Sequence, residues 1–163
     1  MRLPSLACVV VALHASTAVA ADACSLLAQS EAAVVVGQPV TQVIPAGPER
    51  DDESGGQLSH CTYRAANAAL VVSVVEFPSG AEAREQLTKN LVQERVEGDN
   101  AKVSEEPGLG DKAFYGATAK GATFVFLYKN KVIGVGVGGP GTGQRAGLKE
   151  LLRTAAKTVA SKA

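Results

Sequence analysis

The stretch Ala122–Gly138, ATFVFLYKNKVIGVGVG, contains two runs of β-forming residues on either side of the dipeptide Lys129-Asn130. Side chains alternate between the two faces of a strand, so the first run separates its aromatic residues from its aliphatic ones. These sets are Phe124, Phe126 and Tyr128 on one face, and Val125 and Leu127 on the other. A tight connection of this length is typical of a β-hairpin. We therefore expect antiparallel strands over Ala122–Tyr128 and Lys131–Gly138.

The same patterns, followed outward from this hairpin, predict the remaining elements of the chain. Further strands are expected over Val40–Ile44, Leu58–Arg64, Ala69–Phe77 and Lys112–Gly116, with a short edge strand over Ala101–Ser104. Helices are expected over Asp22–Gly37 and Gly80–Val96, and from Thr142 or Gly143 to Ala160. The order is α-β-β-β-α-(β)-β-β-β-α. Because the strands come in hairpins, this order predicts an α+β fold, an antiparallel β-sheet with helices packed on one face.

The first residues indicate where the protein is sent. Arg2 precedes an apolar stretch, and Ala18-Val19-Ala20 supplies the small residues that a signal peptidase recognises. This pattern predicts a secretory signal peptide over residues 1–20 and a single α+β domain over residues 21–163. The apolar run is too short for a membrane span, so we expect no transmembrane segment after cleavage. The predicted location is exported, either periplasmic or extracellular.

Composition argues against several classes of function. Lys and Arg together number 16 and so do Asp and Glu, so the chain offers no electrostatic attraction for nucleic acid. There is no Trp, and aromatic residues make up only 4% of the chain, less than surfaces that stack bases or sugars usually carry. We expect no nucleic-acid partner.

Two cysteines remain after the signal peptide is removed, Cys24 and Cys61. In an oxidising compartment they are expected to form one disulfide, which would stabilise the fold by roughly 4 kcal/mol in the chain-entropy treatment. The alternative is a lipid anchor on Cys24, for which the preceding Asp22 and the absence of leucine make a poor site.

Several short motifs together resemble those of a known group of sequences. They are Cys24-Ser25-Leu26-Leu27, Gly37-Gln38-Pro39-Val40, Cys61-Thr62-Tyr63 and Gly108-Leu109-Gly110-Asp111-Lys112-Ala113. The pattern is similar to that of small exported bacterial proteins and lipoproteins of unknown function, with the motif order CSLL…GxPV…CxY…GLGDxA. The resemblance implies a paired disulfide and an α+β fold, and carries no catalytic residues. This chain departs from the pattern at Ala28, where threonine is usual, and at Lys112, where glutamate is usual.

The glycine-rich stretch Gly134–Gly139 matches the pattern GxGxxG after a predicted strand. A dinucleotide site also needs a helix that begins inside the motif, whereas Pro140-Gly141 follows here. We interpret the stretch as a glycine-rich strand and loop, and predict no cofactor. Alternating glycines also expose backbone, which allows a partner to approach closely.

Candidates for catalysis or metal binding are few. His60 is the one histidine after the signal peptide, and no GxSxG motif accompanies it, so a hydrolase that uses His60 as a base is the weakest alternative. Asp51-Asp52-Glu53 lacks the spacing of a calcium loop, and Glu105-Glu106 would point in opposite directions in an extended chain. The sequence therefore predicts no catalytic residue and no metal ligand.

What remains is a binding function. We expect a non-catalytic interaction module for a protein or a cell-envelope component, with contacts in the loops Pro45–Gln57 and Gly139–Gly143 and in the turn Pro107–Asp111. The candidate contact residues are Glu49, Arg50, Asp51, Asp52, Leu109, Asp111 and Pro140. The alternative is a small-ligand carrier with a pocket between sheet and helices near Phe124, Phe126 and Tyr128.

Overall fold

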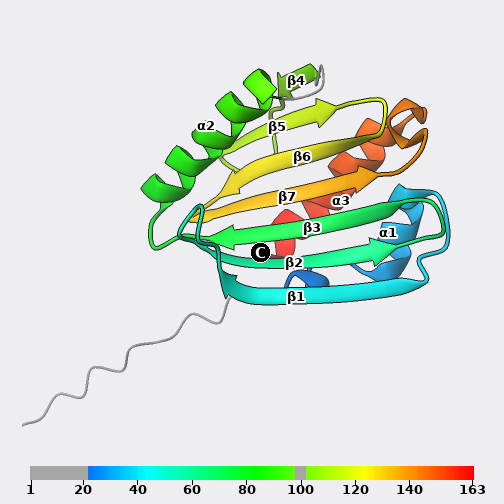
Figure 1. Ribbon diagram of the computed structural model, residues 1–163, viewed down its shortest axis with the longest axis horizontal. Coiled ribbons are helices and arrows are strands. Elements are labelled where there is room, and N and C mark those ends of the chain that lie inside the picture. The colour runs from blue at the N-terminus through cyan, green and yellow to red at the C-terminus, as the bar shows by residue number, and fades with distance from the viewer. Residues whose placement is uncertain (1–21, 98–101) are drawn as a thin grey trace, which may run out of the picture.

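The computed structural model describes residues 22–97 and 102–163 (Figure 1). The predicted signal peptide lies outside the described residues, as does Ala101 of the predicted edge strand. The strands are β1 (Gln42–Arg50), β2 (Gln57–Arg64), β3 (Ala69–Glu76), β4 (Lys102–Glu105), β5 (Lys112–Ala117), β6 (Gly121–Tyr128) and β7 (Lys131–Gly138). The helices are α1 (Gln29–Val36), α2 (Gly80–Glu97) and α3 (Leu148–Lys162), with short 3-10 helices η1 (Ala23–Ser25) and η2 (Thr142–Gln144).

All of these strands form one antiparallel sheet in the order β1-β2-β3-β7-β6-β5-β4. The β6–β7 hairpin pairs Tyr128 with Lys131, and Lys129 adopts a positive φ of 57° in its tight turn. β3 pairs with β7 along its whole length and so joins the two halves of the chain. The predicted α+β class, the antiparallel sheet and the order of elements are confirmed.

The main hydrophobic core lies between the sheet and the helices α1 and α3, which Figure 1 shows behind the strands. Alternation along the strands directs Val72, Phe124 and Ile133 toward these helices, and all three are fully buried. Leu152 and Val159 of α3 are also fully buried, one on each side of the helix centre. Their spacing of seven residues places them on one face of the helix, as the sequence pattern predicts.

Helix α2 packs on the opposite face of the sheet, so the expectation that the helices share one face holds only for α1 and α3. Ala83 and Leu87 of α2 form a second core with strand side chains that point away from the first one. Those strand side chains are Phe114, Leu127 and Val132. The physical reason is that these strands carry large apolar residues on both faces at this end of the sheet, and both faces need cover.

Strand β1 is longer than predicted and includes Pro45 through Arg50, where the sequence predicts a loop. It lies at one edge of the sheet, where proline is tolerated because one side of the strand needs no backbone donors. Its pairing with β2 is irregular between Ala46 and Glu49. The remaining loop, from Asp51 to Gly56, is therefore short.

Two helix boundaries also differ from the prediction. The segment Asp22–Gly37 forms η1 and then α1, and between them Leu26 and Leu27 are buried in the core. Thr142 begins η2, whereas α3 begins at Leu148 after Gly147, which has a positive φ of 74°. A left-handed residue interrupts helical geometry, so the two segments remain separate.

The N-terminal segment is fixed to the sheet by a disulfide and a buried tyrosine. Cys24 and Cys61 form the predicted disulfide, with Cα atoms 4.9 Å apart. Beside it, the hydroxyl of Tyr63 donates to the backbone carbonyl of Leu27 and lies 3.3 Å from that of Cys24. Burial, followed by the nearby negative charges, raises the pKa of Tyr63 to about 12, so the phenol remains a hydrogen-bond donor.

Candidate binding groove

Within residues 22–97 and 102–163, the face of the sheet that carries α2 is covered at one end only. Side chains on this face form rows across the strands, and their size falls from the covered end to the open end. The row beneath α2 is large: Val75, Val132 and Leu127. The row nearer the open end has less side-chain volume, because two of its four members are glycines: Val71, Gly136, Thr123 and Gly116. A depression therefore forms where α2 no longer covers the strands.

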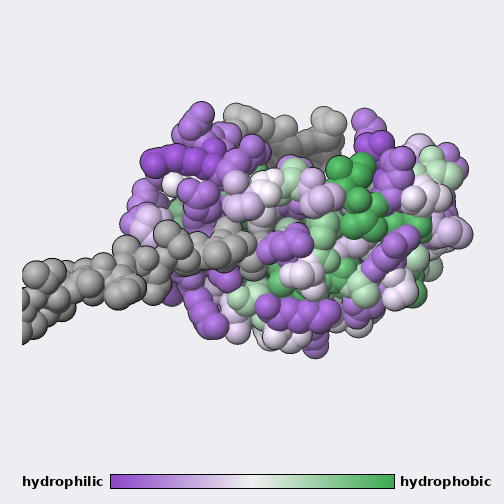
Figure 2. All heavy atoms as spheres, turned by 90° about the horizontal axis from the view of Figure 1, so that it is seen from below, coloured by the Kyte–Doolittle hydropathy of each residue, from purple (hydrophilic) through white to green (hydrophobic). Residues whose placement is uncertain are grey.

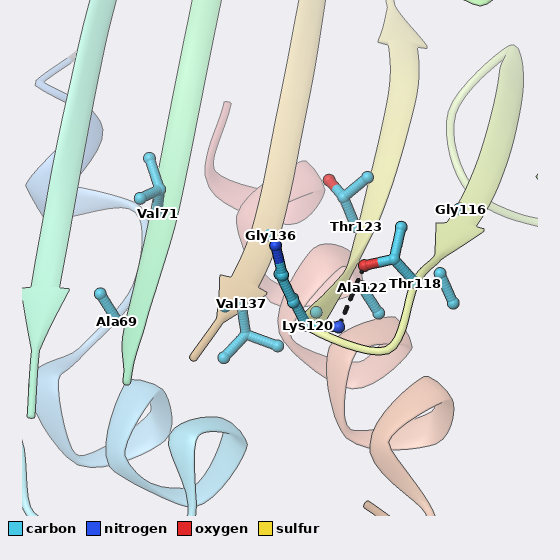
Figure 3. A pocket seen from close by; sticks show the side chains of 12 residues that line it. Ala69, Val71, Gly116, Thr118, Lys120, Ala122, Thr123, Gly136 and Val137 are labelled. Atoms are coloured by element: carbon cyan, nitrogen blue, oxygen red, sulfur yellow. Dashed lines mark hydrogen bonds between the residues drawn. The ribbon is translucent and has the colours of Figure 1, made fainter. Parts of the chain in front are cut away.

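We call this depression the glycine groove, and its volume is about 510 Å³. It crosses the ends of β3, β7, β6 and β5 and includes the turn between β5 and β6 (Figure 3). The lining residues are small or apolar apart from two threonines and a lysine: Ala69, Val71, Gly116, Ala117, Thr118, Lys120, Gly121, Ala122, Thr123, Gly136, Val137 and Gly138.

The floor of the groove follows from the sequence VGVG in β7. Alternation directs Val135 and Val137 into the main core and leaves Gly136 and Gly138 on the groove side. A Cβ at Gly136 would lie 3.1 Å from Oγ1 of Thr123, so even alanine would crowd the floor. The glycines thus keep the backbone of β7 accessible, as the alternating pattern indicated.

Lys120 supplies the positive charge of the groove. Its backbone is fixed on both sides, because its N–H donates to Oγ1 of Thr118 and its carbonyl accepts from the N–H of Gly139. Figure 3 shows its side chain extending into the groove across β7. None of the ion pairs among the described residues includes Lys120, and no acidic residue lines the groove.

A second polar cluster lies at the β4–β5 edge and has a different character. The carboxylate of Glu106 is 2.6 Å from Nζ of Lys149, 2.5 Å from a guanidinium nitrogen of Arg153 and 2.8 Å from Oγ of Ser104. The hydrogen bond from Lys149 is the main cause that lowers the pKa of Glu106 to about 2. Glu106 is buried and its neighbour Glu105 is exposed, in agreement with the expected opposite directions. Because every oxygen of this carboxylate is engaged, the cluster holds the edge of the sheet to α3 and presents no free acid.

The candidate contact residues do not gather at the groove. Glu49, Arg50 and Asp52 are exposed at the end of β1 or just beyond it, at the opposite end of the sheet. The carboxylate of Asp51 accepts from the hydroxyl of Ser54 at 2.5 Å, which is the main cause that lowers the pKa of Asp51 and closes this turn.

The other three candidates are placed differently from one another. Asp111 is exposed at the start of β5, at the same end of the sheet as the Asp51 turn but separated from it by β3, β7 and β6. Leu109 is only 3% exposed and belongs to the main core, so its proposed surface role is wrong. Pro140 is exposed beyond the end of β7 and thus lies nearest the groove.

The predicted pocket beside the aromatic residues of β6 is also wrongly placed. Phe124 and Phe126 are fully buried in the main core, and neither they nor Tyr128 line the glycine groove. The groove lies on the other face, where Thr123 occupies the same strand. The sequence signal that could have found it is the VGVG alternation, which marks one face of β7 as bare.

His60 lies half-buried on β2, paired with Ser73 of β3 and Ala46 of β1. Within the described residues there is no cluster of three or more histidine, cysteine or acidic side chains that could hold a metal ion. Gly134–Gly138 belong to β7 and open no helix, so the strand interpretation of the GxGxxG pattern is confirmed. None of the helices in the described segments is long and apolar enough to cross a membrane.

Large hydrophobic residues are exposed elsewhere, mainly near β1. The most exposed are Val34 of α1, at 60%, and Val43 and Ile44 of β1, at 38% each. Figure 2, which views the molecule from the β1 side, shows hydrophobic side chains gathered toward the end away from the grey trace. These three residues lie outside the glycine groove, so they serve below as a reference for nonspecific apolar binding.

Comparison with known proteins supplies a likeness of fold. No protein-family model matches the chain, and no curated protein sequence matches it. Among solved structures, it is similar to the extracellular domain of PknH from Mycobacterium tuberculosis, with a TM-score of 0.53 and 14% sequence identity. The match covers 85% of this chain and 92% of the PknH domain. At this identity the likeness concerns the fold alone.

Proposed function

We propose that this chain is an exported, non-catalytic binding domain of the cell envelope and that the glycine groove is its binding surface. The main observation in support of this proposal is that helix α2 covers only part of one face of the sheet. A folded chain normally buries such a surface, so a sheet face left open over a hollow of this size is a candidate binding site.

Export is supported by three separate features. The first is the signal-peptide pattern of residues 1–20, and the second is the Cys24–Cys61 disulfide, which is typical of oxidising compartments. The third is that the similar fold of PknH belongs to an extracellular domain. The resemblance to small exported bacterial proteins remains a prediction from the sequence motifs.

Binding without catalysis is supported by the chemistry of the groove. Its side chains provide one ammonium group and two hydroxyls, with no carboxylate, imidazole or thiol that could act as base or nucleophile. Such a surface selects a ligand by shape, apolar contact and one charge. The carrier alternative therefore fits the glycine groove better than the filled layer beneath Phe124.

Methyl-labelled protein offers a direct test. We expect fractions of an envelope extract to shift the methyl resonances of Ala69, Val71 and Thr123 in the groove. The methyl groups of Val34 and Ile44 report nonspecific apolar binding, because they are exposed outside it. If no fraction shifts the groove methyls, or if every shift is matched at Val34 and Ile44, the proposal is wrong.

A variant that fills the groove sharpens this experiment. A Cβ at Gly138 would lie 3.9 Å from the Lys120 carbonyl, an ordinary contact, so Gly138→Leu adds volume to the groove without a clash at Cβ. Gln57→Leu adds the same side chain at an exposed position of β2, at the other end of the sheet. We expect Gly138→Leu to abolish the extract-induced shifts and Gln57→Leu to leave them unchanged.

A further inference from the structure

We propose that the ligand of the glycine groove is a single-chain aliphatic carboxylic acid, with its chain along the floor and its carboxylate paired with Lys120. This inference rests on the proposed function and deepens it by naming the class of ligand. It is argued from the charge, the hydrogen-bonding capacity and the dimensions of the groove.

The charge of the groove selects an anion. Lys120 contributes the one ionic side chain of the lining, and the described ion pairs leave its ammonium group without a carboxylate. Its backbone is held by Thr118 and Gly139, so the side chain starts from a fixed point at the groove. A ligand with one negative head group complements this arrangement.

The floor selects an apolar body. The backbone groups of β3, β7, β6 and β5 bond to one another in the sheet ladder, so the floor offers them to no ligand. A peptide laid across the floor would bury its own amide groups without partners, at a cost of several kcal/mol. A hydrocarbon chain has no such groups and gains from the apolar contact.

The dimensions favour one extended chain. The row Val71, Gly136, Thr123 and Gly116 crosses four neighbouring strands, and a strand spacing of about 4.8 Å gives a trough roughly 14 Å long. Glycine at Gly136 and Gly116 allows the chain to lie close to the backbone, and Val71 bounds the trough on the β3 side. The volume of about 510 Å³ is in the range of small-molecule sites.

The test measures binding of dodecanoate to the purified protein by isothermal titration calorimetry, below the micelle concentration. Dodecanol tests the need for a charge, and dodecyl phosphate tests the choice of head group. We expect dodecanoate to bind more tightly than either, and its methyl-shift footprint to include Ala69, Val71 and Thr123. Gly138→Leu should abolish binding.

Two lysine variants separate a specific ion pair from general charge. Lys120→Gln should weaken dodecanoate binding roughly fivefold, the upper end expected for a solvent-accessible ion pair. It should also remove the preference for dodecanoate over dodecanol and the weakening of binding by added salt. Lys157→Gln makes the same charge change at an exposed position of α3 and should alter none of these quantities.

Each contrary result has a defined meaning. If dodecanoate fails to bind while an envelope fraction still shifts the groove methyls, the ligand class is wrong and the proposed function stands. If neither dodecanoate nor any envelope fraction shifts the groove methyl resonances, both proposals fail. Tighter binding of dodecyl phosphate would overturn the carboxylate assignment, and a preference for dodecanoate that survives Lys120→Gln would overturn the role of Lys120.

Discussion

The Glu106 cluster allows a quantitative prediction about stability. In Glu106→Gln, the side chain keeps its shape but loses its charge, and its amide group must direct a donor at either Lys149 or Arg153. The cost depends on how well each cation can return to water. The side chain of Lys149 is 40% exposed and that of Arg153 is 20% exposed, so both regain hydration only in part.

A buried hydrogen bond to a charged group contributes roughly 1.5–3 kcal/mol to the free energy of unfolding, and an exposed ion pair contributes less than about 1 kcal/mol. The Arg153 contact resembles the first class and the Lys149 contact the second. We therefore expect Glu106→Gln to lower the free energy of unfolding by about 2 kcal/mol near neutral pH. For a domain of this size the melting temperature should fall by about 6 °C.

The stabilisation by Glu106 should depend on pH in a defined direction. The pKa of Glu106 is lowered from 4.5 to about 2 in the folded protein, so ionised Glu106 stabilises the fold above the unfolded-state pKa. That stabilisation is lost as the pH falls from about 4.5 toward 2. The difference in the free energy of unfolding between wild type and Glu106→Gln should be constant from pH 7 to 5 and should become smaller at pH 3.

Urea unfolding followed by circular dichroism at pH 7, 5 and 3 measures this difference. Glu105→Gln is the matched control, because Glu105 is the exposed neighbour and loses the same charge. Equal stability of the two variants at pH 7 would refute the assignment of a stabilising cluster. A difference that does not change between pH 5 and 3 would refute the linkage to ionisation of Glu106.

Three further predictions concern the attachments of the N-terminal segment. Tyr63→Phe should lower the free energy of unfolding by about 1–2 kcal/mol, because it leaves the buried Leu27 carbonyl without its donor, whereas Tyr128→Phe should change it little in the same urea titration. Reduction of the disulfide, or the double change of Cys24 and Cys61 to serine, should cost roughly 4 kcal/mol, and an unchanged urea midpoint would contradict this. Arg145 donates hydrogen bonds to the carbonyls of Val35 at 2.6 Å and Val34 at 2.9 Å, at the C-terminal end of α1. Arg145→Gln should therefore lower the free energy of unfolding by about 1 kcal/mol and speed amide hydrogen exchange in α1 selectively. A uniform change in exchange over the whole domain would contradict this capping role.

The order of elements could be predicted from the sequence because its periodicities are local. Strand alternation in Ala122–Gly138 and the helical stripe of Leu148, Leu152 and Val159 are each contained in one segment. The disulfide followed from compartment and cysteine count. For the strands and helices, neighbouring residues are sufficient to specify the structure, whereas the disulfide joins residues 37 positions apart.

Features that depend on partners distant in sequence could not be predicted in this way. The strand at Pro45–Arg50 forms because β1 lies at an edge, and edge position is a property of the whole sheet. The side of the sheet that α2 covers depends on where Phe114, Leu127 and Val132 meet it. The glycines on either side of Leu109 predict a surface turn, whereas its side chain enters the core.

The groove combines both situations. The alternating glycines of β7 leave part of one face of this strand without side chains, and the sequence predicts that a partner can approach the backbone closely there. The pairing of β3, β7, β6 and β5 is needed to see that the row of Gly136 continues through Val71, Thr123 and Gly116. Lys120 carries no local signal, because its role depends on the turn that places it beside Gly138.

The two edges of the sheet bear on how this protein behaves at high concentration. An uncovered edge strand can recruit a strand from another molecule, and repetition of that step produces fibrils. Here β1 carries Pro45 and Pro48 and an irregular register, and β4 at the other edge is only four residues long. Prolines remove backbone donors from the first edge, and shortness limits the second. The chain thus has built-in resistance to polymerisation through the edges of its sheet.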